Sequence, residues 1–208
     1  VPVIRALARS IDVPVSVDTR KASVAAAALE AGAQIVNDIS ALGDPAMAGR
    51  VAASGAALVL MHMQGSPETM QDDPRYGDPV AEIADWLAGR LAAARDAGIA
   101  GDRLVADPGL GFGKRLEDNL AILRRLEELH ALGVPLLVGA SRKSFLGALT
   151  GRPVEERRDA SVIAAVAAAE AGAAVLRVHD VRATVDALRL VSDLRAAHSR
   201  ARGEAQGP

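Results

Sequence analysis

The sequence lacks cysteine, has few aromatic residues and carries almost no net charge, and each of these properties excludes a class of protein. Without cysteine, the chain has neither a disulfide framework nor a thiolate metal site. Aromatic residues make up 2% of the chain, which leaves almost no material for stacking nucleobases. The net charge of -2 argues against a surface that binds polyanions, so we expect no nucleic-acid partner.

The sequence also lacks an apolar run long enough to cross a bilayer, and nothing in it resembles a signal peptide. We therefore expect a cytoplasmic protein with no membrane partner. The chain has 208 residues, of which 50% are hydrophobic, and this is enough for one sizeable domain with its own core. We assign residues 1–198 to that domain and residues 199–208 to a polar, disordered tail.

Six apolar segments alternate with helical patterns, as they do in parallel βα units. The expected strands lie at residues 13–18, 33–39, 57–62, 103–107, 135–140 and 174–179. The expected helices lie at residues 1–9, 21–31, 45–54, 79–97, 117–132 and 160–171, and from residue 181 onward. Asp44 and Asp159 are expected to cap two of these helices. The two longest connections, residues 63–78 and 141–158, are predicted to be loops.

Each expected strand ends in a polar side chain, and this pattern decides between two α/β folds. An open doubly wound sheet gathers polar groups at one switch point, whereas a closed (β/α)8 barrel places them around a common mouth. The strand ends carry Asp18, Asn37, His62, Asp107, Ser141 with Lys143, and Arg177 with His179. We therefore predict an α/β fold of the (β/α)8 TIM-barrel type, with six βα units present.

Two of the strand-end acids predict a site for a heterocycle. Asp18 and Asp107 end apolar runs, so their carboxylates lie at a partly buried rim and require donors. Guanine and pterin offer ring N–H and amino groups as donors, and Asn37 adds both a donor and an acceptor. The alternative is that each acid only caps the following helix. That alternative is weaker for Asp107, which precedes Pro108 and Gly109.

A group of cationic side chains predicts an anion site beside these acids. Lys143 follows the fifth expected strand and is our first catalytic candidate, with a solvated basic loop as the alternative. Arg177 and His179 alternate with apolar residues, so they point to one side of a strand and suit phosphate or pyrophosphate. The alternative is that Arg177 pairs with one of the rim acids.

The run from Gly109 to Lys114 is rich in glycine, but it is not a nucleotide motif. A dinucleotide fingerprint requires glycine at the position of Lys114, and a P-loop requires Ser or Thr at the position of Arg115. We interpret the glycines as allowing the backbone to approach a flat ligand, with Phe112 as an apolar face over it. A simple tight turn is the alternative.

Six segments together resemble the dihydropteroate synthase family. They are residues 16–19 (SVDT), 37–40 (NDIS), 60–65 (LMHMQG), 107–114 (DPGLGFGK), 141–144 (SRKS) and 177–180 (RVHD). The family is a (β/α)8 barrel of folate biosynthesis that joins 6-hydroxymethyl-7,8-dihydropterin pyrophosphate to p-aminobenzoate and releases pyrophosphate. The resemblance implies a Mg²⁺ cofactor, a homodimer formed through the late helices, and a target of sulfonamides.

The resemblance also implies a role for each matching residue. Pterin would be bound by Asp18, Asn37, Asp107 and Lys143, with Met61 lining the pocket; p-aminobenzoate by Phe112 and Ser144; and pyrophosphate by Arg177 and His179. Lys143, Arg177 and His179 would act in catalysis, and none of these residues is expected to bind the metal. The site would stabilise charge on the leaving group, and no general base would be required.

The family begins with two further strands that have no counterpart in this sequence. Their loops carry an Asn that helps to bind metal and pyrophosphate, and a Thr-Arg-Pro segment that closes over p-aminobenzoate. We therefore expect unpaired edges at residues 13–18 and 174–179, weak pterin binding and little turnover. Two alternatives are a methyltransferase domain that binds methyltetrahydrofolate in the same class of barrel, and a non-catalytic pterin-binding protein.

Overall fold

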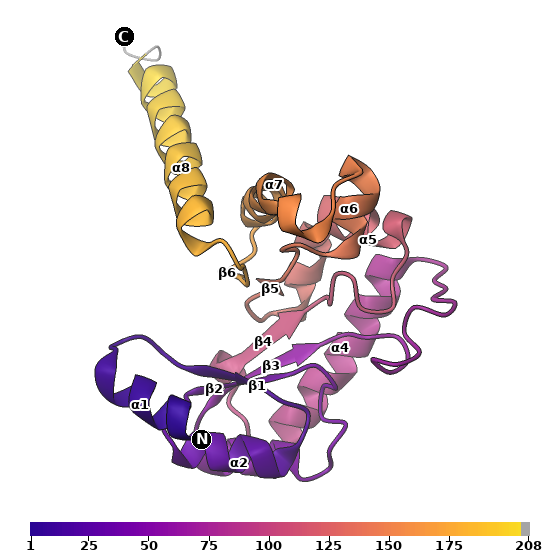
Figure 1. Cartoon of the computed structure of the whole chain (residues 1–208), viewed down its shortest axis with the longest axis vertical. Helices are drawn as coiled ribbons and strands as arrows, with labels where there is room; N and C mark the ends of the chain where they lie inside the picture. Colours follow the sequence, from indigo (N-terminus) through magenta and orange to yellow (C-terminus); the bar gives the residue numbers. More distant parts are fainter. Residues whose placement is uncertain (205–208) are drawn as a thin grey trace.

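Parallel strands alternate with helices along the protein (Figure 1). The computed structural model describes residues 1–204, and the side chains of residues 1–197. The strands are β1 (Ser16–Asp18), β2 (Ile35–Asp38), β3 (Ala57–Met61), β4 (Leu104–Asp107), β5 (Leu137–Val138) and β6 (Val175–Leu176). The α-helices are α1 (Pro2–Ser10), α2 (Ala22–Glu30), α3 (Met47–Ser54), α4 (Pro79–Asp96), α5 (Leu116–Arg124), α6 (Ser144–Thr150), α7 (Arg158–Glu170) and α8 (Val181–Glu204). Short 3-10 helices are η1 (Gly101–Arg103), η2 (Leu126–Leu132) and η3 (Val154–Glu156).

The strands form two parallel sheets, one with the order β1-β2-β3-β4 and one with β5 beside β6. An isolated bridge between Ala106 and Leu136 connects β4 to the segment before β5. Within residues 1–204, β1 pairs only with β2 and β6 only with β5, so the barrel is not closed. The six predicted strands are present, and the expected unpaired edges lie where the sequence places them.

The last two strands are shorter than predicted, because side chains replace backbone partners beyond them. β5 and β6 each span 2 residues. The Arg177 N–H still donates to the Val138 carbonyl at 3.0 Å. Two residues later the His179 N–H donates to the Ser141 Oγ at 3.2 Å, so the ladder ends and a polar site begins.

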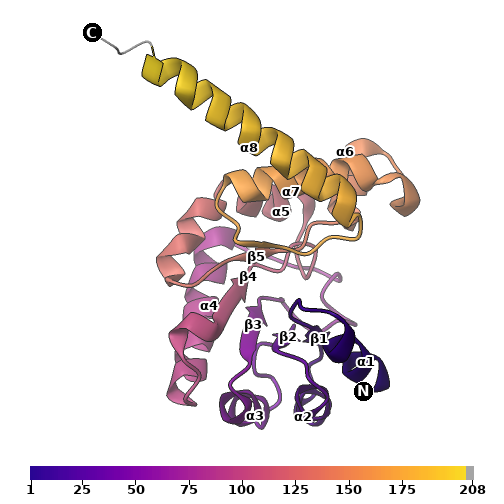
Figure 2. The ribbon, with the colours of Figure 1, turned by 90° about the vertical axis from the view of Figure 1, so that its left-hand side faces the viewer.

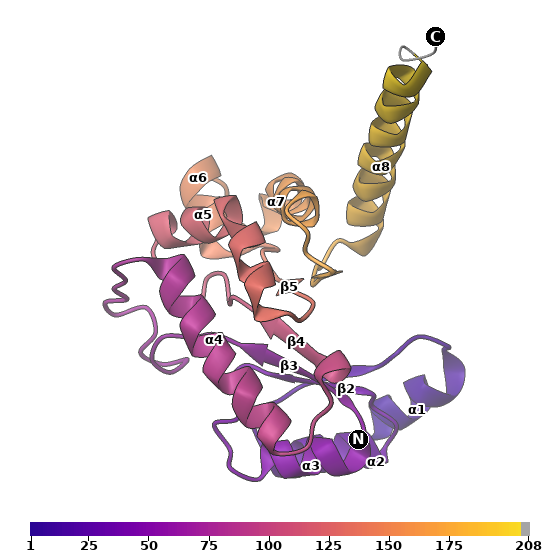
Figure 3. The ribbon, with the colours of Figure 1, turned by 180° about the vertical axis from the view of Figure 1, so that it is seen from behind.

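The longest core helix, α4, begins and packs as the sequence predicts. Asp78 caps it, because its Oδ1 accepts from the N–H groups of Val80 and Ala81 at 3.0 and 3.2 Å. Figure 3 shows α4 crossing the sheet. Its buried face consists of Val80, Ile83, Leu87, Leu91 and Ala94. On α2 the buried residues are Ala22, Ala25 and Ala28, whose small side chains allow a close approach to neighbouring elements.

Two predicted element boundaries are wrong. The helix predicted for residues 117–132 is interrupted at Arg125, whose guanidinium binds Asp78, the cap of α4, at 3.0 Å and Glu128 at 2.7 Å. The loop predicted for residues 141–158 contains α6, because Phe145 and Leu146 are buried in the core and hold this segment as a helix.

The two predicted aspartate caps are also wrong. Helix α7 begins at Arg158, so Asp159 lies inside its first turn. Helix α3 begins after Ala46, which places Asp44 before the helix. Asp44 instead joins two segments, since its Oδ2 accepts from the Ala22 N–H at the start of α2 at 2.8 Å.

Helix α8 packs against α7, to which Arg195 is joined through Glu170, and its far end extends away from the rest of the protein, as Figures 1 and 2 show. Large apolar side chains on it are exposed, among them Val181, Leu190 and Leu194. The helix includes residues 199–204 of the predicted tail, and residues 205–208 lie outside the described residues. None of the helices described for residues 1–204 combines the length and apolarity needed to cross a membrane.

The exposed edge of β6 predicts self-association, since an unpaired parallel strand is a template for another chain. Val175 on that edge is 43% exposed, and Val175→Lys should reduce the average molecular mass measured by light scattering. Val24→Lys on α2, where the native side chain is 45% exposed, is the matched control and should leave the mass unchanged. A wild-type chain that is monomeric at high concentration would contradict the prediction.

Candidate active site

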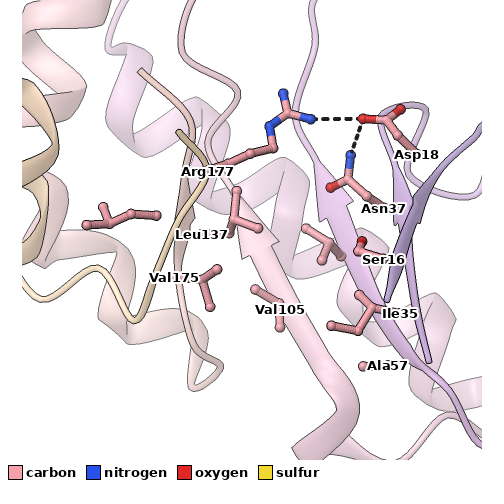
Figure 4. Close-up of a pocket in the computed structure, with 11 residues that line it drawn as sticks. Ser16, Asp18, Ile35, Asn37, Ala57, Val105, Leu137, Val175 and Arg177 are labelled. Atoms are coloured by element: carbon pink, nitrogen blue, oxygen red, sulfur yellow. Dashed lines mark hydrogen bonds and ion pairs between the residues drawn. The ribbon is translucent and has the colours of Figure 1, made fainter. Parts of the chain in front are cut away.

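Three predicted site residues meet at the carboxyl ends of β1, β2 and β6. The parallel register places Asp18 opposite Asn37. The Asp18 Oδ2 accepts from the Asn37 Nδ2 at 2.9 Å and from the Arg177 Nη1 at 2.8 Å. Figure 4 shows both contacts converging on this carboxylate. Arg177 therefore pairs with a rim acid, which is the alternative that the sequence leaves open.

An apolar cavity of ≈ 340 Å³ lies below this cluster. Its walls come from the inward-facing residues of the strands, among them Ile35, Val59, Val105, Leu137 and Val175. The Asn37 Oδ1 is buried and has no hydrogen-bond partner within the described residues. A buried acceptor without a partner is costly, so the cavity is suited to a flat, largely apolar ligand with a polar edge.

A second cavity of ≈ 330 Å³ is lined by cationic groups, namely Lys143, Arg177 and His179. Ser141 supports this cavity, because its Oγ lies 2.9 Å from the His179 Nδ1 and accepts from the His179 N–H. Arg177 lines both cavities. The arrangement places an anion-binding space directly beside the apolar one.

Lys143 lies between the aromatic part of the site, formed by Phe112, and the cationic part, formed by Arg177 and His179. Its Nζ is 3.6 Å from the centre of the Phe112 ring, a cation–π contact. Burial and the charge of Arg177 lower the pKa of Lys143 to about 8, and the carboxylates of Asp107 and Asp18 oppose this shift. Ser144, also predicted to be a site residue, is exposed at the first position of α6.

Asp107 and Met61 lie opposite each other at the ends of β4 and β3. Met61 is fully buried and Asp107 is 2% exposed. The Asp107 Oδ1 accepts from the Gly109 N–H at 2.7 Å. Burial raises the pKa of the Asp107 carboxyl, while that hydrogen bond and the charge of Arg177 lower it. The buried carboxylate thus faces cationic groups and keeps an oxygen for a ligand.

The glycine-rich turn approaches the protein's own backbone, and the interpretation that its glycines face a ligand is wrong for two of them. Gly109 has φ +68°, and a Cβ there would lie 1.9 Å from the His62 carbonyl oxygen. At Gly113, with φ +60°, a Cβ would lie 2.5 Å from the Gln64 carbonyl oxygen. Only glycine fits at these two positions, because both the conformation and the space exclude a side chain.

Two residues that were not predicted to belong to the site hold this end of the barrel together. Lys114 is buried beneath the turn, with its Nζ 3.0 Å from the Nδ1 of His62. Arg142 has φ +59° and binds the Asp180 carboxylate at 2.9 Å, which joins the loop after β5 to the start of α8. The sequence does contain a signal for the role of Lys114, because this lysine directly follows three closely spaced glycines.

The site does not provide a metal centre of its own. Within the part of the chain that the structure describes, no three His, Cys, Asp or Glu side chains are close enough together to hold a metal ion. The strand-end acids Asp18 and Asp107 are instead bound by Arg177 and by the Gly109 N–H. The residues present therefore do not fit the implied Mg²⁺.

We expect the charge of Lys143 to contribute to anion binding below about pH 8, the pKa of its amine in the folded protein. Pyrophosphate binding, measured by calorimetry, should be about tenfold weaker in Lys143→Met at pH 7. At pH 9 the difference between the two proteins should be smaller, because the native amine has lost its proton. The comparison within each pH cancels the ionisation of the ligand. An equal difference at both pH values would exclude Lys143 from the anion site.

Comparisons with known proteins identify the family. A family model described as "Pterin binding enzyme" matches residues 1–179. The dihydropteroate synthase of Escherichia coli K12 is 45% identical over 191 residues, which cover 92% of this chain and 68% of that protein.

Solved structures are similar over most of the chain. The dihydropteroate synthase from Stenotrophomonas maltophilia, with imidazole bound in its active site, has a TM-score of 0.91 and 49% identity and covers 94% of this chain and 74% of its own. The enzyme from Xanthomonas albilineans in complex with 7,8-dihydropteroate has a TM-score of 0.88 and 46% identity, with 94% and 72% coverage. The predicted TIM-barrel type of fold is thereby confirmed.

The match of the family model to residues 1–179 and the identity to relatives over nine-tenths of the chain lead to one conclusion. The chain belongs to the family of pterin-binding enzymes, and its homologues are dihydropteroate synthases, which are transferases.

Proposed function

We propose that this protein acts as a dihydropteroate synthase, which joins 6-hydroxymethyl-7,8-dihydropterin pyrophosphate to p-aminobenzoate. The observation that carries the proposal is the pair of adjoining cavities that share Arg177, one apolar with a carboxylate and a free amide oxygen, the other cationic. A pterin ring and a pyrophosphate group joined by one methylene carbon fit such a pair. The solved complex of the X. albilineans enzyme with 7,8-dihydropteroate supports the same assignment.

The ring would bind by donating to the acceptors at the rim. Pterin carries N–H and amino donors, and the carboxylates of Asp18 and Asp107 accept them. The unpartnered Oδ1 of Asn37 would accept a further bond, which removes the cost of burying it. Met61, fully buried beside Asp107, gives the ring an apolar surface.

The leaving group would bind to the cations. As the C–O bond between the methylene carbon and pyrophosphate breaks, its electron pair passes to pyrophosphate, and Arg177, His179 and Lys143 stabilise the added negative charge. The amino nitrogen of p-aminobenzoate forms the new bond to the same carbon and releases a proton to water. Arg177 donates to the Asp18 carboxylate, so it would compete with the ring donors for that carboxylate. When the ring occupies Asp18, Arg177 becomes available to the leaving group.

The second substrate would pack on Phe112, whose half-buried side chain lies within the glycine-rich turn. Ser144 at the exposed start of α6 would bind its carboxylate. A related structure of the X. albilineans enzyme contains 4-aminobenzoic acid.

Two further properties belong to the same proposal. A homodimer would form through α7 and α8, because Val181, Leu190 and Leu194 are exposed along α8. Mg²⁺ is implied by the family resemblance alone, and the described residues do not form a site for it by themselves. A methyltetrahydrofolate-dependent methyltransferase would share the ring pocket but has no need of the cationic cavity.

A pyrophosphate-release assay tests the activity directly. The chain should release pyrophosphate only when both the pterin pyrophosphate and p-aminobenzoate are present. Calorimetry with each substrate distinguishes the alternatives, because a non-catalytic pterin-binding protein would bind pterin pyrophosphate without release. Failure to bind pterin in any form would refute the proposal.

Asp107→Ala should lower the affinity for the pterin ring by about 2 to 4 kcal/mol, the usual cost of removing a charged partner from a desolvated site. Asp102→Ala, which removes an exposed carboxylate five residues earlier, is the matched control and should bind normally. Circular dichroism establishes that both variants fold. Unchanged pterin affinity in Asp107→Ala would exclude this residue from the ring pocket.

Arg177→Ala should change the affinity for the pyrophosphate part of the first substrate but not the affinity for its pterin ring. Binding of pterin pyrophosphate and of free pyrophosphate should weaken by about tenfold to a hundredfold, whereas pterin without pyrophosphate should bind no more weakly than before. Arg182→Ala, on the exposed surface of α8, controls for the loss of one positive charge. Equal losses for all three ligands would place Arg177 in the ring pocket or in the fold.

A further inference from the structure

The glycine-rich turn is held by side chains from four places in the chain, one for each of four consecutive carbonyl groups. The Gln71 Nε2 donates to the Gly111 carbonyl at 2.8 Å, and the Tyr76 hydroxyl donates to the Gly113 carbonyl at 2.7 Å. The Asn119 Nδ2 donates to the Lys114 carbonyl at 3.3 Å. The fourth carbonyl, that of Phe112, accepts from the Nζ of Lys114 at 3.0 Å.

Lys114 differs from the other three because it connects the turn to the residue that follows β3. It is 4% exposed. Besides the Phe112 carbonyl, its Nζ lies 3.0 Å from the His62 Nδ1 and 3.4 Å from the His62 carbonyl oxygen. Three acceptors thus surround a group that carries three N–H donors when protonated, so every donor of the ammonium ion has a partner.

The position of Lys114 bears on the aromatic face of the site. The Phe112 carbonyl that it binds belongs to the residue whose ring contacts the Lys143 ammonium at 3.6 Å. The same turn is fixed against β3 at Gly109, where there is no space for a Cβ beside the His62 carbonyl. The orientation of the Phe112 ring relative to the two cavities therefore depends on the contact between Lys114 and His62.

Several titratable groups face the Lys114 amine. They are Asp107 at the end of β4, Asp118 of α5, Lys143 after β5 and His62 after β3, and the ring of Tyr76 lies beside His62 with ring centres 6.1 Å apart. Burial lowers the pKa of Lys114 to about 7, with Asp107 and Asp118 acting in the opposite direction. Burial also lowers the pKa of His62 to about 3 and raises the pKa of Tyr76, so both are neutral at pH 7.

We propose that Lys114 is a positioning residue that holds Phe112 in place for the arylamine substrate, acting through the Phe112 carbonyl and His62. The role rests on the function proposed above. Lys114 touches no substrate in this arrangement; it fixes the backbone that carries the aromatic ring. The competing explanation is that its alkyl chain only fills space, in which case methionine would serve equally well.

The two explanations differ in what Lys114→Met does to each substrate. Dissociation constants are measured by calorimetry for pterin pyrophosphate and, with pyrophosphate present, for p-aminobenzoate. The variant should bind p-aminobenzoate about tenfold more weakly and pterin pyrophosphate within about twofold of wild type, since only the aromatic side of the site loses its support. Lys21→Met, which changes an exposed lysine at the start of α2, is the matched control.

The pH dependence of the wild-type protein provides a second measurement that does not depend on a variant folding well. As the pH rises through about 7, Lys114 loses one of its three N–H donors, so p-aminobenzoate binding should weaken. The single tryptophan, Trp86, lies edge-on to His62 with ring centres 5.0 Å apart. Its fluorescence should change with the same midpoint in wild type and Lys21→Met, and not in Lys114→Met.

The outcomes separate the two proposals. A wild-type chain that binds p-aminobenzoate, together with a Lys114→Met variant of equal affinity and equal pH profile, overturns the role of Lys114 and leaves the proposed function intact. Equal weakening for both substrates also overturns it, because the lysine then supports the fold as a whole. A wild-type chain that binds neither substrate overturns both proposals.

Discussion

The parallel register of β1 to β4 is the constraint on which the candidate active site depends. Parallel strands have their carboxyl ends at one edge of the sheet, so the residue that ends each strand is carried to the same side. Asp18 comes to lie opposite Asn37, and Met61 opposite Asp107. A shift of one residue in any strand would turn these side chains to the other face, where the helices pack. The positions of the site residues therefore depend on the apolar core, which fixes the register of the strands.

Much of this arrangement follows from local sequence. Each strand is an apolar run that ends in a polar residue, and α4 is indicated by Pro79 and the spacing of its apolar residues. Contacts between residues far apart in the chain could not be predicted in the same way. The bond between Lys114 and His62 joins residues 52 positions apart, and the pair of Arg142 and Asp180 joins residues 38 apart.

The misplaced boundaries have the same origin. Helix α5 ends at Arg124 because the next residue turns to an aspartate 47 positions earlier, a contact that helical periodicity does not contain. Lys114 looks like part of an exposed loop, since glycine and lysine are typical of loops. Its burial depends on Gly109 and Gly113 letting the turn approach β3. The roles assigned to individual site residues still rest on the family resemblance and on chemical fit.

The bonds that hold the glycine-rich turn have a consequence for the design of inhibitors. The carbonyl groups of residues 111 to 114 are bound by side chains, and the N–H groups of Gly109, Gly111 and Phe112 are bound by Asp107, Asn119 and the Gly109 carbonyl. A compound that forms a hydrogen bond with one of these backbone groups has to break an existing bond, so it exchanges one bond for another and gains little affinity. A compound that stacks on the ring of Phe112 displaces only water or the Lys143 ammonium. Optimisation at this corner of the site should therefore favour aromatic shape over polar substituents.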